Sequence, residues 1–312
     1  MRAGLHVLVW LLGSGLLPAA ALAWGPLAHA VIGELAEAYL LRDDPGLQRL
    51  LAEMRHPAQR EAVRAALLGT HPPGPGKALR TLALWPDWHR GAPGMLPFDS
   101  QRHYVNLPAG ARYDRARHCP QDLCLVETLL AERARLADPQ QPLPRRIVAL
   151  AWVTHLLGDL HQPLHTGRAA DRGGTLTCVT WLGQPSRLVR RDGDLACSGA
   201  DLHAVWDSLL LEAVTGERRP QAAPDLARAL RPLLAPVQAA EPPLAAGTEA
   251  QWRALIVRWL SETHALLELQ DIYPAGNLID DCYIRSHYRT LRQQLLKAAV
   301  RLAAVLQATL NP

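Results

Sequence analysis

Several features that would place a chain of this length in a common protein class are missing or scarce. After residue 23, no apolar run is long enough to cross a membrane, no glycine-rich phosphate loop occurs, and strands do not alternate with helices. The chain has no Asn-x-Ser/Thr glycosylation sequence. Lysine occurs only at Lys77 and Lys297, and phenylalanine only at Phe98. The net charge of +4 is a mild basic excess, which permits an anionic partner without indicating one.

The one long apolar run lies at the amino end. Residues 5–17 are apolar and follow Arg2, and Ala21-Leu22-Ala23 comes after them. This is the pattern of a secretory signal peptide with a small-residue cleavage site. We therefore expect residues 1–23 to be removed and the mature chain to begin at Trp24. The alternative, a retained membrane anchor, is disfavoured because the run is short.

The remaining residues, 24–312, are enough for a single domain. An exported chain without a glycosylation signal fits a bacterial protein of the periplasm or one that is secreted. No strong association face is evident, which favours a monomer.

Apolar spacing predicts an all-α fold with a small β-hairpin between helices. We expect helices at residues 27–41, 44–68 (two short helices broken near Pro57), 144–161, 201–215, 223–236, 250–269 and 279–309. Residues 175–182 alternate β-branched and apolar side chains, and residues 186–189 are their expected hairpin partner.

Five cysteines in an exported chain indicate disulfides. Cys119 and Cys124 can close a tight loop, and Cys178 and Cys197 flank a segment that can form a hairpin. Cys282 is then left over. Spacing alone does not settle this pairing.

Residues 155–167, HLLGDLHQPLHTG, hold three histidines and one aspartate within an otherwise apolar stretch. His155 and Asp159 are four residues apart, so on a helix they share one face. Pro163 ends that helix, and His165 follows on the turn. A buried His and Asp need partners, and a metal ion would satisfy both. A hydrogen-bonded core histidine is the alternative.

A second pair at the same spacing, His203 and Asp207, lies on another expected helix. Two such pairs favour a metal site more strongly than one. Three upstream candidates are His29, Asp87 within LWPDW, and His103 within HYVNLP. Read alone, each has an ordinary explanation: a surface residue, a helix cap and a core hydrogen-bonding group.

Together these candidates offer nitrogen and oxygen ligands and no thiolate, which favours zinc in a catalytic site. They are too many for one ion, so two or three metals are expected. Clustered metals suit phosphoester hydrolysis. A di-iron bundle would require Glu-x-x-His pairs, and none appears.

In this order, Trp24 with His29, WPDW, HYVNLP, HLLGDLHQPLHTG, DRGG and LHAVWD resemble the motifs of the S1/P1 nuclease family. The resemblance spans essentially the whole chain after residue 23. It implies a mainly helical enzyme with three zinc ions. Such an enzyme cuts single-stranded DNA and RNA to 5′-mononucleotides and removes 3′-phosphates from nucleotides. Its attacking group would be a metal-bound water or hydroxide.

The resemblance also implies which residues hold each metal. One zinc would be held by Asp87, His103, His155 and Asp159. A second would be held by His165, His203 and Asp207. The third would be held by the free amino group and carbonyl of Trp24, by His29, and by Asp159 as a bridge. His161 points away from the face of Asp159 and is not expected to be a ligand.

This chain departs from the family pattern at three positions. Asn106 stands where eukaryotic members carry an Asp that orients or deprotonates the attacking water. Thr175 stands where the family has a substrate-contacting Asn, and Asp201 replaces another Asn. Asn106 and Thr175 remain the expected substrate contacts, with Asn106 orienting the water. The segment between Cys178 and Cys197 is also longer than usual, which alters the rim of the cleft.

Two other functions fit the same ligands. A zinc-dependent phospholipase C would use a related helical fold and similar His/Asp spacing. A periplasmic zinc-binding protein without catalytic activity would fit the changes at Asn106 and Thr175.

Overall fold

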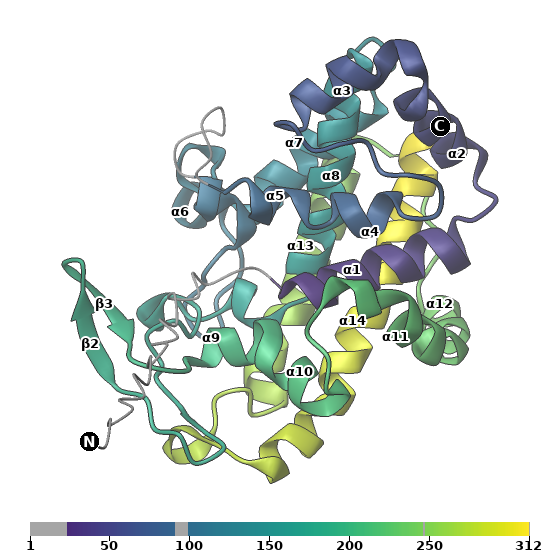
Figure 1. Cartoon of the computed structure of the whole chain (residues 1–312). Helices are drawn as coiled ribbons and strands as arrows, with labels where there is room; N and C mark the ends of the chain where they lie inside the picture. The colour runs from purple at the N-terminus through teal and green to yellow at the C-terminus, as the bar shows by residue number, and fades with distance from the viewer. Residues whose placement is uncertain (1–23, 91–98, 246, 312) are drawn as a thin grey trace, which may run out of the picture.

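The computed structural model describes residues 24–90, 99–245 and 247–311, and most of them are helical, as the apolar spacing predicts (Figure 1). The expected signal peptide lies outside the described residues. The helices are α1 (Pro26–Leu35), α2 (Pro45–Arg55), α3 (Arg60–Ala66), α4 (Ala78–Leu82), α5 (Trp85–Trp88), α6 (Arg115–His118), α7 (Leu125–Ala137), α8 (Leu143–Asp159), α9 (Leu202–Ala204), α10 (Leu210–Thr215), α11 (Ala223–Leu230), α12 (Leu234–Ala240), α13 (Glu249–Leu269) and α14 (Asp281–Leu310).

Single-turn helices connect many of these elements. They are η1 (Ala36–Leu40), η2 (Pro57–Gln59), η3 (Asp99–His103), η4 (Pro120–Asp122), η5 (Pro163–Thr166), η6 (Ala169–Asp171), η7 (Val205–Leu209), η8 (Pro220–Ala222), η9 (Arg231–Leu233) and η10 (Ala275–Asn277). The break expected near Pro57 is therefore present, between α2 and α3.

Helix α8 lies at the centre of the core. It packs against α7 along its length and also contacts α3, α4, α5 and α14. Because it is surrounded, its side chains are apolar on nearly every face. Pro144 is tolerated in the first turn, where the backbone N–H has no helical partner. The helix ends at Asp159, ahead of Pro163, so the polar end of α8 lies inside the protein.

The four short strands form two separate two-stranded sheets. β2 (Leu188–Arg191) pairs antiparallel with β3 (Asp194–Cys197), whereas β1 (Thr180–Trp181) pairs in parallel with β4 (Leu278–Ile279). A small hairpin between helices is therefore present. The predicted partners of its strands were wrong: residues 175–182 do not pair with residues 186–189. The turn at Asp192-Gly193 closes the hairpin instead.

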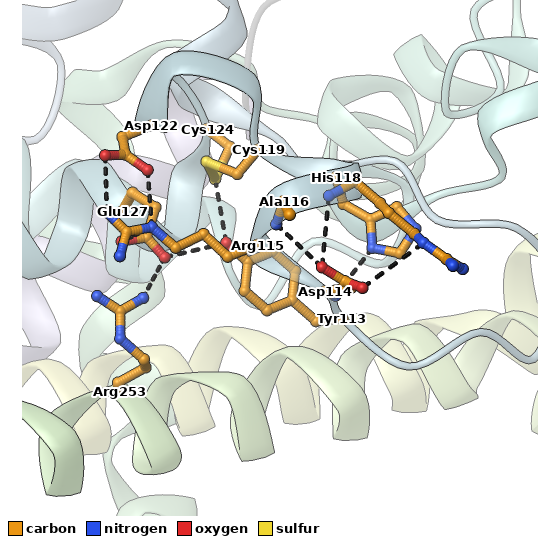
Figure 2. The surroundings of a disulfide bond; sticks show 11 residues. Tyr113, Asp114, Arg115, Ala116, His118, Cys119, Asp122, Cys124, Glu127 and Arg253 are labelled. Carbon is orange, nitrogen blue, oxygen red and sulfur yellow. Dashed lines mark hydrogen bonds and ion pairs between the residues drawn. A yellow bond between two sulfur atoms is a disulfide. The ribbon is translucent and has the colours of Figure 1, made fainter.

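Two disulfides, Cys119–Cys124 and Cys178–Cys197, join the pairs that the sequence suggested, and Cys282 is free and exposed. Figure 2 shows the first of them at the start of α7. Nearby, the Glu127 carboxylate accepts a hydrogen bond from the Tyr113 hydroxyl at 3.0 Å and pairs with Arg253 of α13. The loop is thereby attached to two helices of the core.

Among the described residues, no helix combines the length and the apolar character that a membrane span requires.

Candidate metal centre

The carboxyl end of α8 presents the first two groups of the centre. His155 Nε2 lies 3.0 Å from Asp159 Oδ2, one helical turn away, and both side chains are fully buried. The other ring nitrogen, His155 Nδ1, donates a hydrogen bond to the Ala83 carbonyl at 2.7 Å. That bond selects the tautomer in which Nε2 keeps its lone pair toward Asp159.

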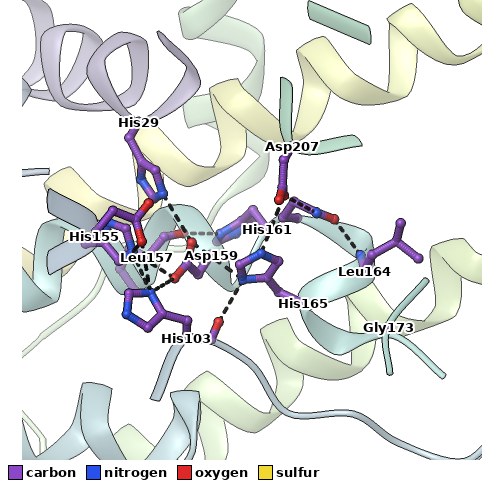
Figure 3. A network of polar contacts seen from close by, with 12 residues as sticks. His29, His103, His155, Leu157, Asp159, His161, Leu164, His165, Gly173 and Asp207 are labelled. Atoms are coloured by element: carbon purple, nitrogen blue, oxygen red, sulfur yellow. Dashed lines mark hydrogen bonds and ion pairs between the residues drawn. The ribbon is translucent and has the colours of Figure 1, made fainter. Parts of the chain in front are cut away.

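His103 of η3 and Asp87 of α5 approach the same point (Figure 3 shows His103). His103 Nδ1 lies 2.8 Å from His155 Nε2 and 3.1 Å from Asp159 Oδ2. Asp87 Oδ1 is 3.7 Å from the nearest ring nitrogen of each histidine. Two imidazole nitrogens at this distance must share a proton or a cation. Ligand atoms of His103, His155 and Asp159 lie within 4.8 Å of one another, as a metal site requires.

His29 enters from α1. Its ring stacks on His155 with centroids 4.0 Å apart, and its Nε2 lies 3.2 Å from Asp159 Oδ1 without forming a hydrogen bond. Its ligand atom also groups with those of Asp87 and His155. Gly158 makes room for this ring, because a Cβ at that position would lie 2.8 Å from His29 Nδ1.

A second group consists of His165 of η5, His203 of α9 and Asp207 of η7. His165 Nε2 lies 3.5 Å from Asp207 Oδ1, and His203 Nε2 lies 3.3 Å from Asp207 Oδ2. Backbone carbonyls orient both rings: His165 Nδ1 donates to His103 at 2.7 Å and His203 Nδ1 to Gly173 at 2.6 Å.

Asp159 lies between the two groups. Its Oδ2 faces His103 and His155, while its Oδ1 lies 3.2 Å from His29 Nε2 and 3.6 Å from His165 Nδ1. The eight predicted His and Asp side chains therefore come together around one buried carboxylate. Trp24 is also fully buried, and the next residue's N–H, that of Gly25, donates to the Asp207 carbonyl at 2.7 Å.

The donor set fits a cation. Several buried atoms have no hydrogen-bond partner among the described residues, including His29 Nε2, Asp159 Oδ1, His165 Nε2 and Asp207 Oδ2. An unpartnered buried polar atom costs about 1–3 kcal/mol, and metal coordination removes that cost. Imidazole and carboxylate ligands without thiolate are the set found in catalytic zinc sites.

The local electrostatics also suit metal binding. Burial alone would raise the pKa of Asp159, but His155 and His165 hold it well below its ordinary value. Burial lowers the pKa of His103 to about 4. Burial would lower the pKa of His165 as well, but Asp159 and Asp207 raise it to about 9. A neutral imidazole and an ionised carboxylate are the forms that bind metals, so a metal must displace a proton at His165.

A pocket of about 230 Å³ opens onto the cluster. Its lining includes His103, His165 and His203 together with the predicted contacts Asn106 and Thr175. Sequence reasoning did not name four further lining residues, Arg90, Ser100, Tyr104 and Arg172. Arg90 follows Asp87 by one helical turn and pairs with it at 2.5 Å, a spacing that was readable in the sequence.

His161 faces away from the cluster, as its position two residues after Asp159 indicated. Its Nδ1 donates to the Leu157 carbonyl at 2.7 Å, and its Nε2 accepts from Arg301 at 3.1 Å. Arg301 is only 3% exposed and also pairs with Glu241 and Glu262. This buried network anchors the turn after α8 to α13 and α14.

A mainly helical fold with a buried His/Asp centre at the end of one core helix defines a narrow class of proteins. The sequence profile of the S1/P1 Nuclease family matches residues 24–311, so the chain belongs to the S1/P1 nuclease family. Endonuclease 2 of Arabidopsis thaliana is 25% identical over 331 aligned residues, which cover 97% of each chain. Endonuclease 3 of the same plant is 24% identical, with 92% of this chain and 88% of its own length covered. Nuclease P1 of Penicillium citrinum is 22% identical, with 90% and 95% covered.

Proposed function

We propose that the protein is a zinc-dependent phosphodiesterase that cleaves single-stranded DNA and RNA to 5′-mononucleotides and removes 3′-phosphates from nucleotides. Membership of a nuclease family supports the hydrolase class. The observation that carries the finer proposal is the convergence of eight His and Asp side chains from separate segments beside one pocket.

Three zinc ions would be held as follows. Asp87, His103, His155 and Asp159 would hold one, and His165, His203 and Asp207 a second. Trp24, through its free amino group and carbonyl, would hold the third with His29 and Asp159. Two of these sets contain triads whose ligand atoms lie within 4.8 Å of one another, which supports the assignment. Zinc ions held there would supply a nucleophile from water at neutral pH and neutralise charge on the phosphate.

The chain's own polar groups would position the substrate. Asn106 lines the pocket, and its Oδ1 is buried without a partner among the described residues, so it can accept a hydrogen bond from water or substrate. Unlike an aspartate, it cannot take up a proton at neutral pH. Thr175, which also lines the pocket, donates its hydroxyl proton to the Arg172 carbonyl at 3.1 Å, and its oxygen can still accept a hydrogen bond.

The pocket supports a preference for single strands. The bases of a single strand are free to leave the stack, so one of them can enter a space of about 230 Å³. Tyr104 is the aromatic side chain in its lining and would contact the base or sugar.

We further propose that residues 1–23 are a cleaved signal peptide. Residues 24–312 would then form one catalytic domain that acts as a monomer in the periplasm or outside the cell. Signal cleavage would supply the free amine at Trp24. The burial of Trp24 beside Asp207 supports this role, since the amino end of the mature chain then lies next to the ligands.

Elemental analysis, amino-terminal sequencing and assays on three substrates test the proposal. We expect about three zinc per chain, Trp24 as the first residue, cleavage of single-stranded DNA and release of phosphate from a 3′-nucleotide. Turnover of a lecithin analogue alone would identify a phospholipase, and three zinc without turnover would identify a zinc-binding protein. One zinc or none, with Trp24 free, would refute the metal assignment.

A further inference from the structure

The β2–β3 hairpin is an exposed element near the pocket. It extends from the body of the molecule beside α9 (Figure 1), and most of its residues are exposed. Leu188 and Leu195 are 52% and 42% exposed. A two-stranded ribbon of this kind is marginal by itself and needs an attachment or a partner.

The base of the hairpin is attached to the pocket wall. The Cys178–Cys197 disulfide joins the end of β3 to the segment that follows Thr175. Backbone hydrogen bonds from Val179 to Ala200 and from Leu202 to Thr177 continue this attachment toward α9, which carries His203. The hairpin is therefore held in place by the same backbone that lines the site.

Near its tip, the hairpin is attached a second time. Arg172, which lines the pocket, donates to both carboxylate oxygens of Asp194 at 3.0 and 3.2 Å. Arg172 begins a tight turn, since its φ is +53° and that of Gly173 is +64°. This two-point contact orients the face of the hairpin that carries Asp194 toward the pocket.

Three arginines line the hairpin. Arg191 is opposite Asp194, on the face that turns toward the pocket, and Arg187 lies four residues earlier in the same alternation. Arg190 is on the other face, opposite Leu195. All three are exposed, and no carboxylate among the described residues forms an ion pair with any of them. The two acids at the turn of the hairpin are Asp192 and Asp194, and Asp194 already pairs with Arg172.

We infer that the β2–β3 hairpin binds single-stranded polynucleotide beyond the nucleotide that occupies the pocket. Arg187 and Arg191, on the face that turns toward the pocket, contact its backbone phosphates. This inference rests on the proposed function. The strand rises by about 3.3 Å per residue, so Arg187 and Arg191 are roughly 13 Å apart and reach different phosphates. A strand that continues from the pocket along the hairpin contacts more phosphates than a mononucleotide does, so the hairpin favours long substrates over short ones.

The size of the effect follows from counterion release. Each phosphate contact on a single strand contributes about −0.7 to the slope of log affinity against log salt, so the two contacts of Arg187 and Arg191 contribute about −1.4. At 0.1 M salt, replacing Arg187, Arg190 and Arg191 with alanine should weaken oligonucleotide binding roughly 25-fold. The salt slope should become shallower by about 1.4.

The experiment uses the zinc-loaded enzyme and a fluorescent phosphorothioate oligothymidylate, which resists hydrolysis. Binding is measured by anisotropy over a range of salt concentrations for wild type, the triple alanine variant and a triple lysine variant at the same positions. The matched control replaces Arg42, Arg49 and Arg60, which are exposed near α2 and α3, away from the hairpin. Hydrolysis of a 3′-mononucleotide is measured in parallel.

Among the variants, only the alanine variant should bind the oligonucleotide more weakly and with a shallower slope of log affinity against log salt. Its hydrolysis of the 3′-mononucleotide should stay within twofold of wild type. Unchanged affinity, or an equal loss in the Arg42/Arg49/Arg60 control, would overturn the inference. The inference would also be overturned if the protein were a dimer that the alanine substitutions dissociate, with no effect on oligonucleotide binding. If wild type hydrolyses neither substrate, the proposed function fails, yet hairpin-dependent binding would still support the nucleic-acid surface.

Discussion

Gly158→Ala should remove one metal ion without unfolding the protein. The new Cβ would lie 2.8 Å from His29 Nδ1 and 2.9 Å from His29 Cε1. An ordinary contact is about 3.5–4.0 Å, so the ring must move by roughly 0.7 Å or more. Metal–ligand distances tolerate only about 0.2 Å. The ring is fully buried and stacked on His155, so it has little space in which to adjust.

The thermodynamic expectation separates this effect from general damage. Alanine favours the helix by about 1 kcal/mol over glycine, which offsets part of an overpacking cost of about 1–3 kcal/mol. The variant should therefore fold. Its metal content should fall by one ion per chain, and its activity by about 100-fold. Metal content is measured by mass spectrometry after dialysis at low free zinc, and folding by thermal unfolding.

Two comparisons make the test sharp. Gly74→Ala is the control, because a Cβ at Gly74 has no atom within 4 Å. His29→Ala should lose the same metal, and the double variant should lose no more than either single variant. A Gly158→Ala protein with three metals and full activity would refute the role of His29 as a ligand.

Four further outcomes are expected. Asp159→Ala should lose two metals and His203→Ala one, and equal losses in metal analysis would contradict the bridging role of Asp159. Asn106→Leu removes the buried acceptor and should lower kcat/KM about 100-fold in oligonucleotide assays, whereas Asn106→Asp should keep activity. Arg301→Met leaves Glu241 without its cation and Glu262 with only the 3.8 Å contact to Arg258, and should destabilise the fold by about 2–4 kcal/mol in urea unfolding, the lower values reflecting the exposure of Glu262. Chelation of zinc should lower the unfolding temperature. A site that had been saturated at 100 times its Kd would lose about 2.7 kcal/mol of stability.

The two i, i+4 pairs were predictable because local geometry decides them. His155–Asp159 and His203–Asp207 each meet within one helical turn, even though η7 interrupts the regular helix at Asp207. The proximity of His29 to His155 depends on how α1 packs against α8, and no spacing rule encodes that contact. Its place in the site came from the family resemblance.

The hairpin error has a similar cause. Alternation over residues 175–182 indicates extended backbone but does not identify a partner, and β1 pairs with β4, a segment far along the chain. The Asp192-Gly193 turn was the more reliable hairpin signal. Helix α7 (Leu125–Ala137) was also not predicted. It is the main neighbour of α8, so an important part of the core was missing from the sequence-based description.

The carbonyls that orient the imidazoles have a consequence for the timing of activity. His155, His165 and His203 are held by Ala83, His103 and Gly173, each on a different part of the chain. Contacts between such distant segments form late in folding, because long loops must close first. A nascent or partly folded chain therefore holds only fragments of the centre. A cell that synthesises a nuclease built in this way is protected from it until folding is complete.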